Sequence, residues 1–126
     1  SIVKWRLTAL GEDRLRFALG ERVAHKPIPT PPFWDGKCRI VLFDIPEKHR
    51  HGRDALRNAM QSLCFHQLQK SAWAYPFPCK KEIMEIAARF DIKPYVKVLT
   101  VEDISDEGAA AHFRSLLKDI PRKNND

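Results

Sequence analysis

The strongest constraint on the fold is a short apolar segment that ends at a proline. Residues 38–45, "CRIVLFDI", form an almost continuous apolar run, which is typical of a central strand buried on both faces of a sheet. Pro46 follows at once, and proline ends a strand because its nitrogen has no hydrogen to donate to a neighbouring strand. The sequence therefore predicts a sheet with this segment as an inner strand.

Downstream of this strand the hydrophobic pattern alternates between helical and strand spacing. Apolar residues recur at helical spacing over residues 48–63, which predicts a helix with arginines on another face. Residues 65–76, "FHQLQKSAWAYP", are predicted to form two strands that join near Lys70. A second helix is expected to end before Pro94, and the last strand is expected over residues 95–101.

The order of these elements predicts an α+β, ferredoxin-like fold. Strand, helix, strand, strand, helix and strand is the βαββαβ order, in which two helices cover one face of a four-stranded antiparallel sheet. The other face of the sheet then needs a cover. A further amphipathic helix is predicted over residues 105–120, before Pro121, and it would cover that face in its own chain or in a neighbouring one.

A proline-rich segment marks the predicted domain boundary. Residues 24–36 are a predicted linker, because four of the nine prolines stand there. Residues 1–23 hold a predicted strand and short helix, residues 37–104 the ferredoxin-like domain, and residues 105–126 the last helix and a polar tail. Because a strand is already under way at the first residues, we expect the chain to be a fragment of a longer protein.

Charge, cysteine content and missing motifs limit the classes of function. The chain carries 22 Lys and Arg against 16 Asp and Glu, a formal charge of +6. This excess favours anionic partners such as nucleic acid, but it also suits an ordinary soluble domain. The three cysteines are far apart, so zinc and redox chemistry are not indicated and a reducing, cytoplasmic location is expected. No membrane partner is expected, and no HExxH, P-loop, GxGxxG or Ser-His-Asp set is present.

Asp44 stands where the first strand ends and the first helix is about to begin. Its carboxylate could hold a magnesium ion, although one carboxylate is a poor site for an ion that takes six oxygen ligands. A twofold dimer would supply a second Asp44. The favoured interpretation is a structural one, in which the carboxylate accepts hydrogen bonds from the amides of residues 46–48 as an Asx-type cap.

A cluster of cations follows this aspartate. The candidate nucleic-acid-binding residues are Lys48, Arg50, Arg53, Arg57 and Lys70. Most of them lie near the predicted start of a helix, where free backbone amides already favour anions, so phosphate contact is one interpretation. The other is a solvated helix face that Glu47 and Asp54 partly neutralise. The sequence leaves both open.

Trp73 and Tyr75 lie on a predicted strand among polar residues. Aromatic side chains in such a place could stack on nucleic-acid bases. Packing in the core or at a dimer interface is the favoured interpretation, because aromatic residues dominate buried contact area.

Several of these motifs recur together in a known family. Residues 34–102 resemble the central domain of the PaaX family of transcriptional repressors, which is itself similar to the small CRISPR-associated endonuclease of the spacer-acquisition complex. The likeness rests on the strand ending "FDIPE", the basic helix start, "FHQLQKSAWAYP" and "YVKVLTVE". The upstream "VKWRLTALGEDRLRF" looks like the end of a winged helix-turn-helix domain.

The resemblance implies a function for the whole chain. It implies a homodimer that serves as the dimerisation and effector-sensing module of a DNA-binding repressor and performs no chemistry of its own. DNA would be read mainly by the part of the winged-helix domain that precedes this chain. Family members respond to aryl-coenzyme A thioesters, so such a compound is the expected effector.

The resemblance also keeps two other functions open. In the CRISPR nucleases an aspartate at the end of the first strand is proposed to hold the metal, and Asp44 matches that position. The alternative is therefore a metal-dependent endonuclease that cuts RNA or DNA, with magnesium or manganese held by Asp44 residues paired across a dimer axis. A purely structural assembly module is the third hypothesis. A complete DNA-reading domain upstream would favour the repressor.

Overall fold

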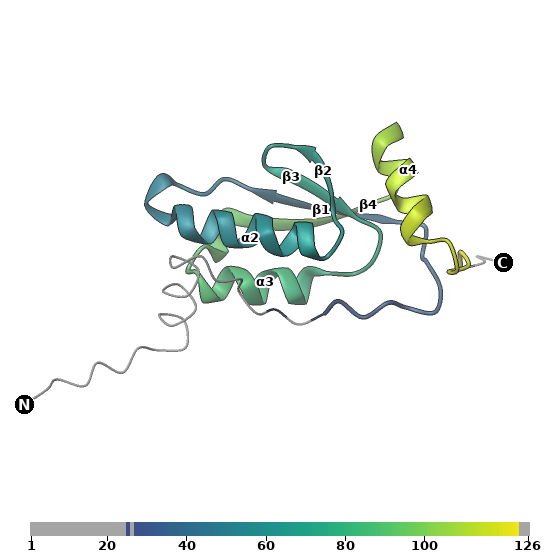
Figure 1. Cartoon of the computed structure of the whole chain (residues 1–126), viewed down its shortest axis with the longest axis horizontal. Helices are drawn as coiled ribbons and strands as arrows, with labels where there is room; N and C mark the ends of the chain where they lie inside the picture. The colour runs from purple at the N-terminus through teal and green to yellow at the C-terminus, as the bar shows by residue number, and fades with distance from the viewer. Residues whose placement is uncertain (1–24, 26, 124–126) are drawn as a thin grey trace, which may run out of the picture.

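The computed structural model of the chain describes residue 25 and residues 27–123 (Figure 1). The strand and short helix predicted within residues 1–23 lie outside the described residues. Along the chain the elements are β1 Cys38–Phe43, the 3-10 turn η1 Glu47–His49, α2 Arg50–Ser62, β2 His66–Gln69, β3 Ala72–Tyr75, α3 Lys80–Arg89, the 3-10 turn η2 Lys93–Tyr95, β4 Val96–Val101 and α4 Glu107–Leu116. No helix in this part of the chain is both long and apolar enough to cross a bilayer.

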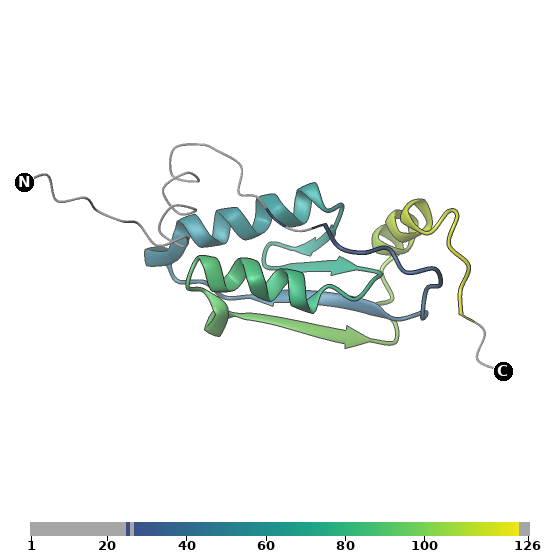
Figure 2. The ribbon, with the colours of Figure 1, turned by 90° about the horizontal axis from the view of Figure 1, so that it is seen from below.

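The four strands form one antiparallel sheet in the order β2-β3-β1-β4. Helices α2 and α3 lie beside each other across one face of it (Figure 2). This is the predicted ferredoxin-like arrangement, with β1 as an inner strand, and the α+β prediction is confirmed. β1 ends at Phe43, two residues earlier than predicted, because from Asp44 onward the chain leaves the β3 ladder and turns toward η1.

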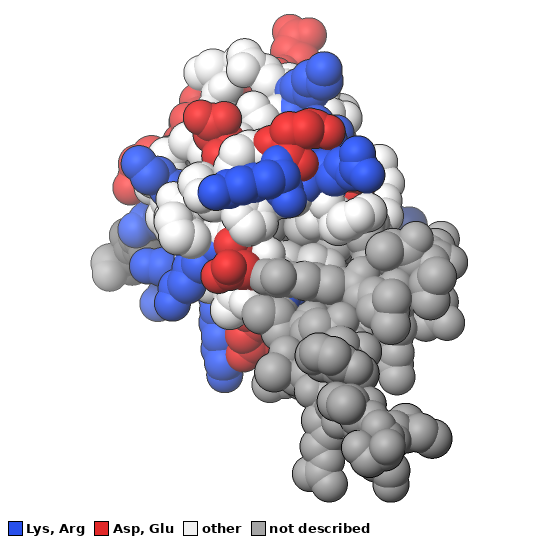
Figure 3. All heavy atoms as spheres, turned by 90° about the vertical axis from the view of Figure 1, so that its left-hand side faces the viewer, with Lys and Arg blue, Asp and Glu red and all other residues white. Residues whose placement is uncertain are grey.

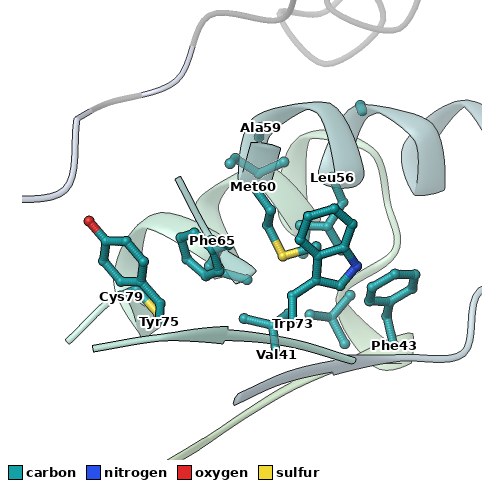
Figure 4. Packing of buried hydrophobic residues seen from close by; sticks show 14 of the residues in the cluster. Val41, Phe43, Leu56, Ala59, Met60, Phe65, Trp73, Tyr75 and Cys79 are labelled. Carbon is teal, nitrogen blue, oxygen red and sulfur yellow. The ribbon is translucent and has the colours of Figure 1, made fainter. Parts of the chain in front are cut away.

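The main core lies between the sheet and helices α2 and α3, and side chains of β1 and β3 point into it (Figure 4). Val41 pairs with Trp73 across these strands; Val41 is fully buried and Trp73 is 3% exposed. The ring of Tyr75 stacks on that of Phe65, with centroids 4.2 Å apart. Burial also raises the pKa of Tyr75 to about 12, so its hydroxyl stays protonated. Trp73 and Tyr75 are therefore core residues and not a base-stacking platform, as the packing interpretation predicted.

Helix α4 lies on the opposite face of the sheet from α2 and α3, at one end of it (Figure 1). Ala109 and Phe113 of α4 pack on Cys38 of β1 and Ala74 of β3 in a second, smaller apolar cluster. The helix begins with a side-chain cap, because Asp106 accepts a hydrogen bond from the amide of Ala109 (2.8 Å). The predicted last helix is thus present and covers part of the open face within its own chain. It runs from Glu107 to Leu116 and not over residues 105–120, because Asp106 caps its start and its regular turns end before Leu117.

Trp34, just before β1, is bonded to the end of the described chain. Its backbone N–H donates to the carbonyl of Pro121 (2.9 Å), and the N–H of Lys123 donates to the carbonyl of Trp34 (2.7 Å). The Arg122 guanidinium lies 5.7 Å from the centroid of the indole ring. The indole N–H donates to the carbonyl of Pro76 (2.9 Å), which fixes the ring against the sheet. We call these contacts of Trp34 with residues 121–123 the clasp.

A buried cation ties the same segment to the sheet. Arg39 of β1 is only 6% exposed, and its Nη2 forms an ion pair with the Asp35 carboxylate. Its Nη1 also donates to the Pro76 carbonyl (2.9 Å). The hydrogen bond from Arg39 lowers the pKa of Asp35, so the carboxylate stays ionised and compensates the buried guanidinium.

Replacing Gly52 with alanine is expected to destabilise the fold. A Cβ there would lie 2.9 Å from Cγ2 of Ile92 and 2.9 Å from Cβ of Phe90, because α2 closely approaches the end of α3. Overpacking of this kind costs about 1–3 kcal/mol, which exceeds the gain of about 1 kcal/mol from better helix propensity. Urea unfolding measures the change. Asn58→Ala, at an exposed position of the same helix, is the control, and a Gly52→Ala variant as stable as this control would contradict the packing argument.

Candidate functional site

Asp44 lies at the end of β1 with its carboxylate exposed. Its backbone N–H donates to the carbonyl of Tyr95 (2.9 Å), but within the described part of the chain its side chain caps neither η1 nor α2. The predicted Asx-type cap is therefore wrong. The reason is local: Pro46 has no amide hydrogen, and the turn is closed by a backbone bond from the N–H of His49 to the carbonyl of Pro46 (2.9 Å).

A shallow groove of about 400 Å³ lies beside this carboxylate. Its described lining comes from β1, the β2–β3 turn, η2 and β4, and Asp44 and Lys97 are the charged residues in it. Among the described residues, no group of three or more His, Cys, Asp and Glu side chains is placed to hold a metal ion. The described lining of the groove thus offers one carboxylate, from Asp44, to an ion that usually takes one or two carboxylates together with substrate oxygens.

The predicted nucleic-acid-binding cations differ in what they contact. Arg53 pairs with Glu47 (3.2 Å). Arg57 donates to the carbonyl of Lys70 (3.1 Å), and its guanidinium lies 5.8 Å from the centroid of the Phe43 ring. These two arginines are therefore engaged within the molecule, and their half-buried stems cover the edge of the core.

The other predicted cations have free charged groups. Lys48, Arg50 and Lys70 are exposed, and their side chains make no hydrogen bond or ion pair with the described residues. Figure 3 faces the end of the molecule at which α2 begins, and it shows Lys and Arg interspersed with Asp and Glu. This end therefore has a mixed charge pattern and not a uniformly positive patch.

The open face of the sheet carries apolar side chains that α4 does not cover. Leu42 of β1 is 37% exposed and Leu99 of β4 is 43% exposed. Ile40, which is half-buried, pairs with Leu99 across the two strands. We call Ile40, Leu42 and Leu99 the open strip. The expectation that β1 is buried on both faces is wrong for Leu42 in the single chain, because α4 reaches only the other end of the sheet.

Residues 31–113 match the family described as PaaX protein central Cas2-like domain. The chain belongs to the PaaX family. No match was found among curated proteins or among solved structures. In this PaaX-family domain the match extends from the last prolines before β1 to Phe113 of α4, so it includes both the sheet and most of the helix on its open face. The predicted winged-helix remnant lies outside both the match and the described residues.

A histidine pair in the PaaX-family domain was not predicted from the sequence. The His66 and His112 rings lie 5.4 Å apart, between β2 and α4. Nε2 of His66 is 3.9 Å from the Asp106 carboxylate, and Nε2 of His112 is 2.6 Å from the carbonyl of Cys64. These contacts hold α4 against β2. Residues so distant in sequence leave no local pattern, so only the tertiary structure brings them together.

The cysteines of the domain are all free, and two of them are buried. Burial raises the pKa of Cys79 to about 12 and also raises that of Cys38. Both thiols therefore stay protonated near neutral pH, and a protonated thiol is a weak nucleophile. Cys64 is exposed in the turn after α2.

Replacing Asp44 with alanine is expected to change the free energy of unfolding by less than about 0.5 kcal/mol, because an exposed carboxylate that caps nothing adds little to stability. Asp106→Ala is the matched comparison, since it removes a cap that is made and should cost about 1 kcal/mol. Urea unfolding of both variants measures the difference. Equal destabilisation of the two variants would contradict the geometry described for Asp44.

Proposed function

We propose that this domain is the dimerisation and effector-sensing module of a PaaX-type DNA-binding transcriptional repressor. The observation that carries the proposal is the open strip on a sheet whose other face is filled by α2 and α3. Exposed leucines on adjacent strands of a rigid sheet are a typical contact surface between proteins.

A second copy of the same chain suits the open strip. In a twofold contact the same patch occurs on both partners, so the patch must complement itself. Leucines and an isoleucine on flat neighbouring strands can interdigitate with their own copies. Asp44 and Lys97 border the adjacent groove with opposite charges, so this end of the surface can also pair with itself.

The proposed contribution of this domain to DNA binding is electrostatic. Lys48, Arg50 and Lys70 are exposed with free charged groups, and such cations contact phosphates without reading sequence. In this proposal the specific contacts belong to the upstream winged-helix domain. No observation on the described residues favours the endonuclease alternative, which needs two Asp44 carboxylates paired across a dimer axis; the groove of one chain holds a single one.

The dimer is tested by placing charge in the open strip. We expect the 126-residue chain to sediment as a dimer, and we expect Leu42→Glu combined with Leu99→Glu to produce a monomer that is still folded, because buried unpaired carboxylates oppose association. Sedimentation velocity measures the mass, and circular dichroism checks the fold. Phe33→Glu is the control, since Phe33 is also apolar and 54% exposed but lies before β1. A monomeric parent chain, or a dimeric double variant, would refute this interface.

The electrostatic contribution is tested by the salt dependence of DNA affinity. We expect the double variant Lys48→Ala, Arg50→Ala to lower the slope of log K against log salt by about 0.9 for each phosphate that is no longer neutralised, hence by about 2. Fluorescence anisotropy with a duplex of arbitrary sequence measures the slope. Lys80→Ala with Lys81→Ala, which removes two exposed cations at the start of α3, is the matched control. Equal slopes for the two double variants would show that Lys48 and Arg50 do not contact phosphates.

A further inference from the structure

A cavity of about 550 Å³ lies between α4 and the sheet, away from both the open strip and the groove at Asp44. Trp34 and Cys38 contribute to one side of it, and the loop of residues 103–107 contributes to another. The remaining wall is one face of α4, formed by Ala110, Phe113, Arg114 and Leu117. These four residues follow helical spacing, so the whole face of the helix is turned toward the cavity.

Another side of the cavity is apolar. Its lining includes Phe113 and Trp34, and an aromatic ring packs well among such side chains. Cys38 is 6% exposed and its thiol has no hydrogen-bond partner among the described residues. Because a thiol is only a weak hydrogen-bonding group, it lets an apolar group lie against it at little cost.

One side of the cavity is acidic. Asp103, Asp106 and Glu107 line this acidic side, and Arg114 is the one cation among the described lining residues. Asp103 accepts hydrogen bonds from the N–H and the hydroxyl of Ser105 (3.1 and 3.2 Å), which lowers its pKa and keeps it ionised. Glu107 is exposed, and the described residues offer its carboxylate no salt bridge. An ammonium group is therefore attracted to this acidic side, and an anion is repelled.

We propose that this cavity binds a small aromatic amine, with the ring against the apolar lining at Trp34 and Phe113 and the ammonium group at the carboxylates of residues 103–107. The proposal rests on the proposed effector-sensing function and gives it a place, but binding here does not require the dimer. An aryl-coenzyme A thioester, the effector that the resemblance implies, carries several negative phosphate charges and is disfavoured at the acidic side of this cavity, so the proposal departs from that expectation. The cavity also adjoins Trp34, so an occupant contacts the residue that joins the linker to the sheet.

The test compares three ligands that differ mainly in charge. Tryptamine is cationic, tryptophol is neutral and indole-3-propionate is anionic, and all carry the same ring on a short chain. Binding to the full 126-residue chain is followed by two-dimensional ¹H–¹⁵N NMR. We expect tryptamine to bind most tightly and indole-3-propionate most weakly, with shifts at the Trp34 indole N–H and at the amides of α4.

Two pairs of variants locate the site and the charge effect. Ala110→Leu fills the cavity and should abolish tryptamine binding, whereas Ala111→Leu, at the next exposed position of the same helix, should leave it unchanged. Glu107→Gln should weaken tryptamine binding about two- to fivefold and Arg114→Gln should tighten it by a similar factor, as expected for exposed charges.

The proposal is overturned if tryptamine does not bind, if the three ligands bind equally, or if Ala110→Leu binds as well as Ala111→Leu. Sedimentation of the same samples keeps this result separate from the proposed function. A dimer that does not bind tryptamine removes the ligand proposal alone. A monomer that binds it in the expected charge order removes the dimer interface alone.

Discussion

The fold depends on the pairing of β1 with neighbours on both sides. β3 and β4 each form an antiparallel ladder with it, so β1 fixes the plane on which everything else is packed. Its side chains alternate between the two faces: Val41 is fully buried under α2, while the neighbouring Leu42 is 37% exposed on the opposite face. One strand therefore sets both the core and the surface available for association.

The two faces of the sheet differ in how much of their structure could be predicted from the sequence. The helical face could be predicted because the spacing of apolar residues in residues 48–63 and residues 65–76 repeats with a short period. That pattern predicted the element order and the inner position of β1. The burial of Trp73 and Tyr75 was favoured for another reason, since aromatic residues dominate buried contact area. The domain limits remain predictions, since residues 1–24 lie outside the described part.

The candidate sites were harder to predict, because they depend on which groups the side chains contact in the folded chain. Asp44 precedes a helix in sequence, but the intervening proline turn is closed by the backbone, so the carboxylate is left exposed. The sequence left open whether Arg53 and Arg57 contact phosphates or belong to a helix face that Glu47 and Asp54 partly neutralise. In the structure Arg53 pairs with Glu47, and Arg57 contacts Phe43 and a carbonyl. The cavity beside α4 and the contact between His66 and His112 join distant segments, and no local pattern marks them.

The clasp has a mechanical consequence. Trp34 and Lys123 share backbone hydrogen bonds, so the segment that enters the domain and the segment that leaves it are anchored at one point. A force applied to either segment acts on the same backbone hydrogen bonds of Trp34. A movement that breaks these bonds therefore releases both segments together. Because the Trp34 indole is also bonded to the carbonyl of Pro76 after β3, the sheet acts as the rigid base of this anchor. A movement transmitted through the segment before β1 would thus act at the same point of the sheet as a movement transmitted through the segment after α4.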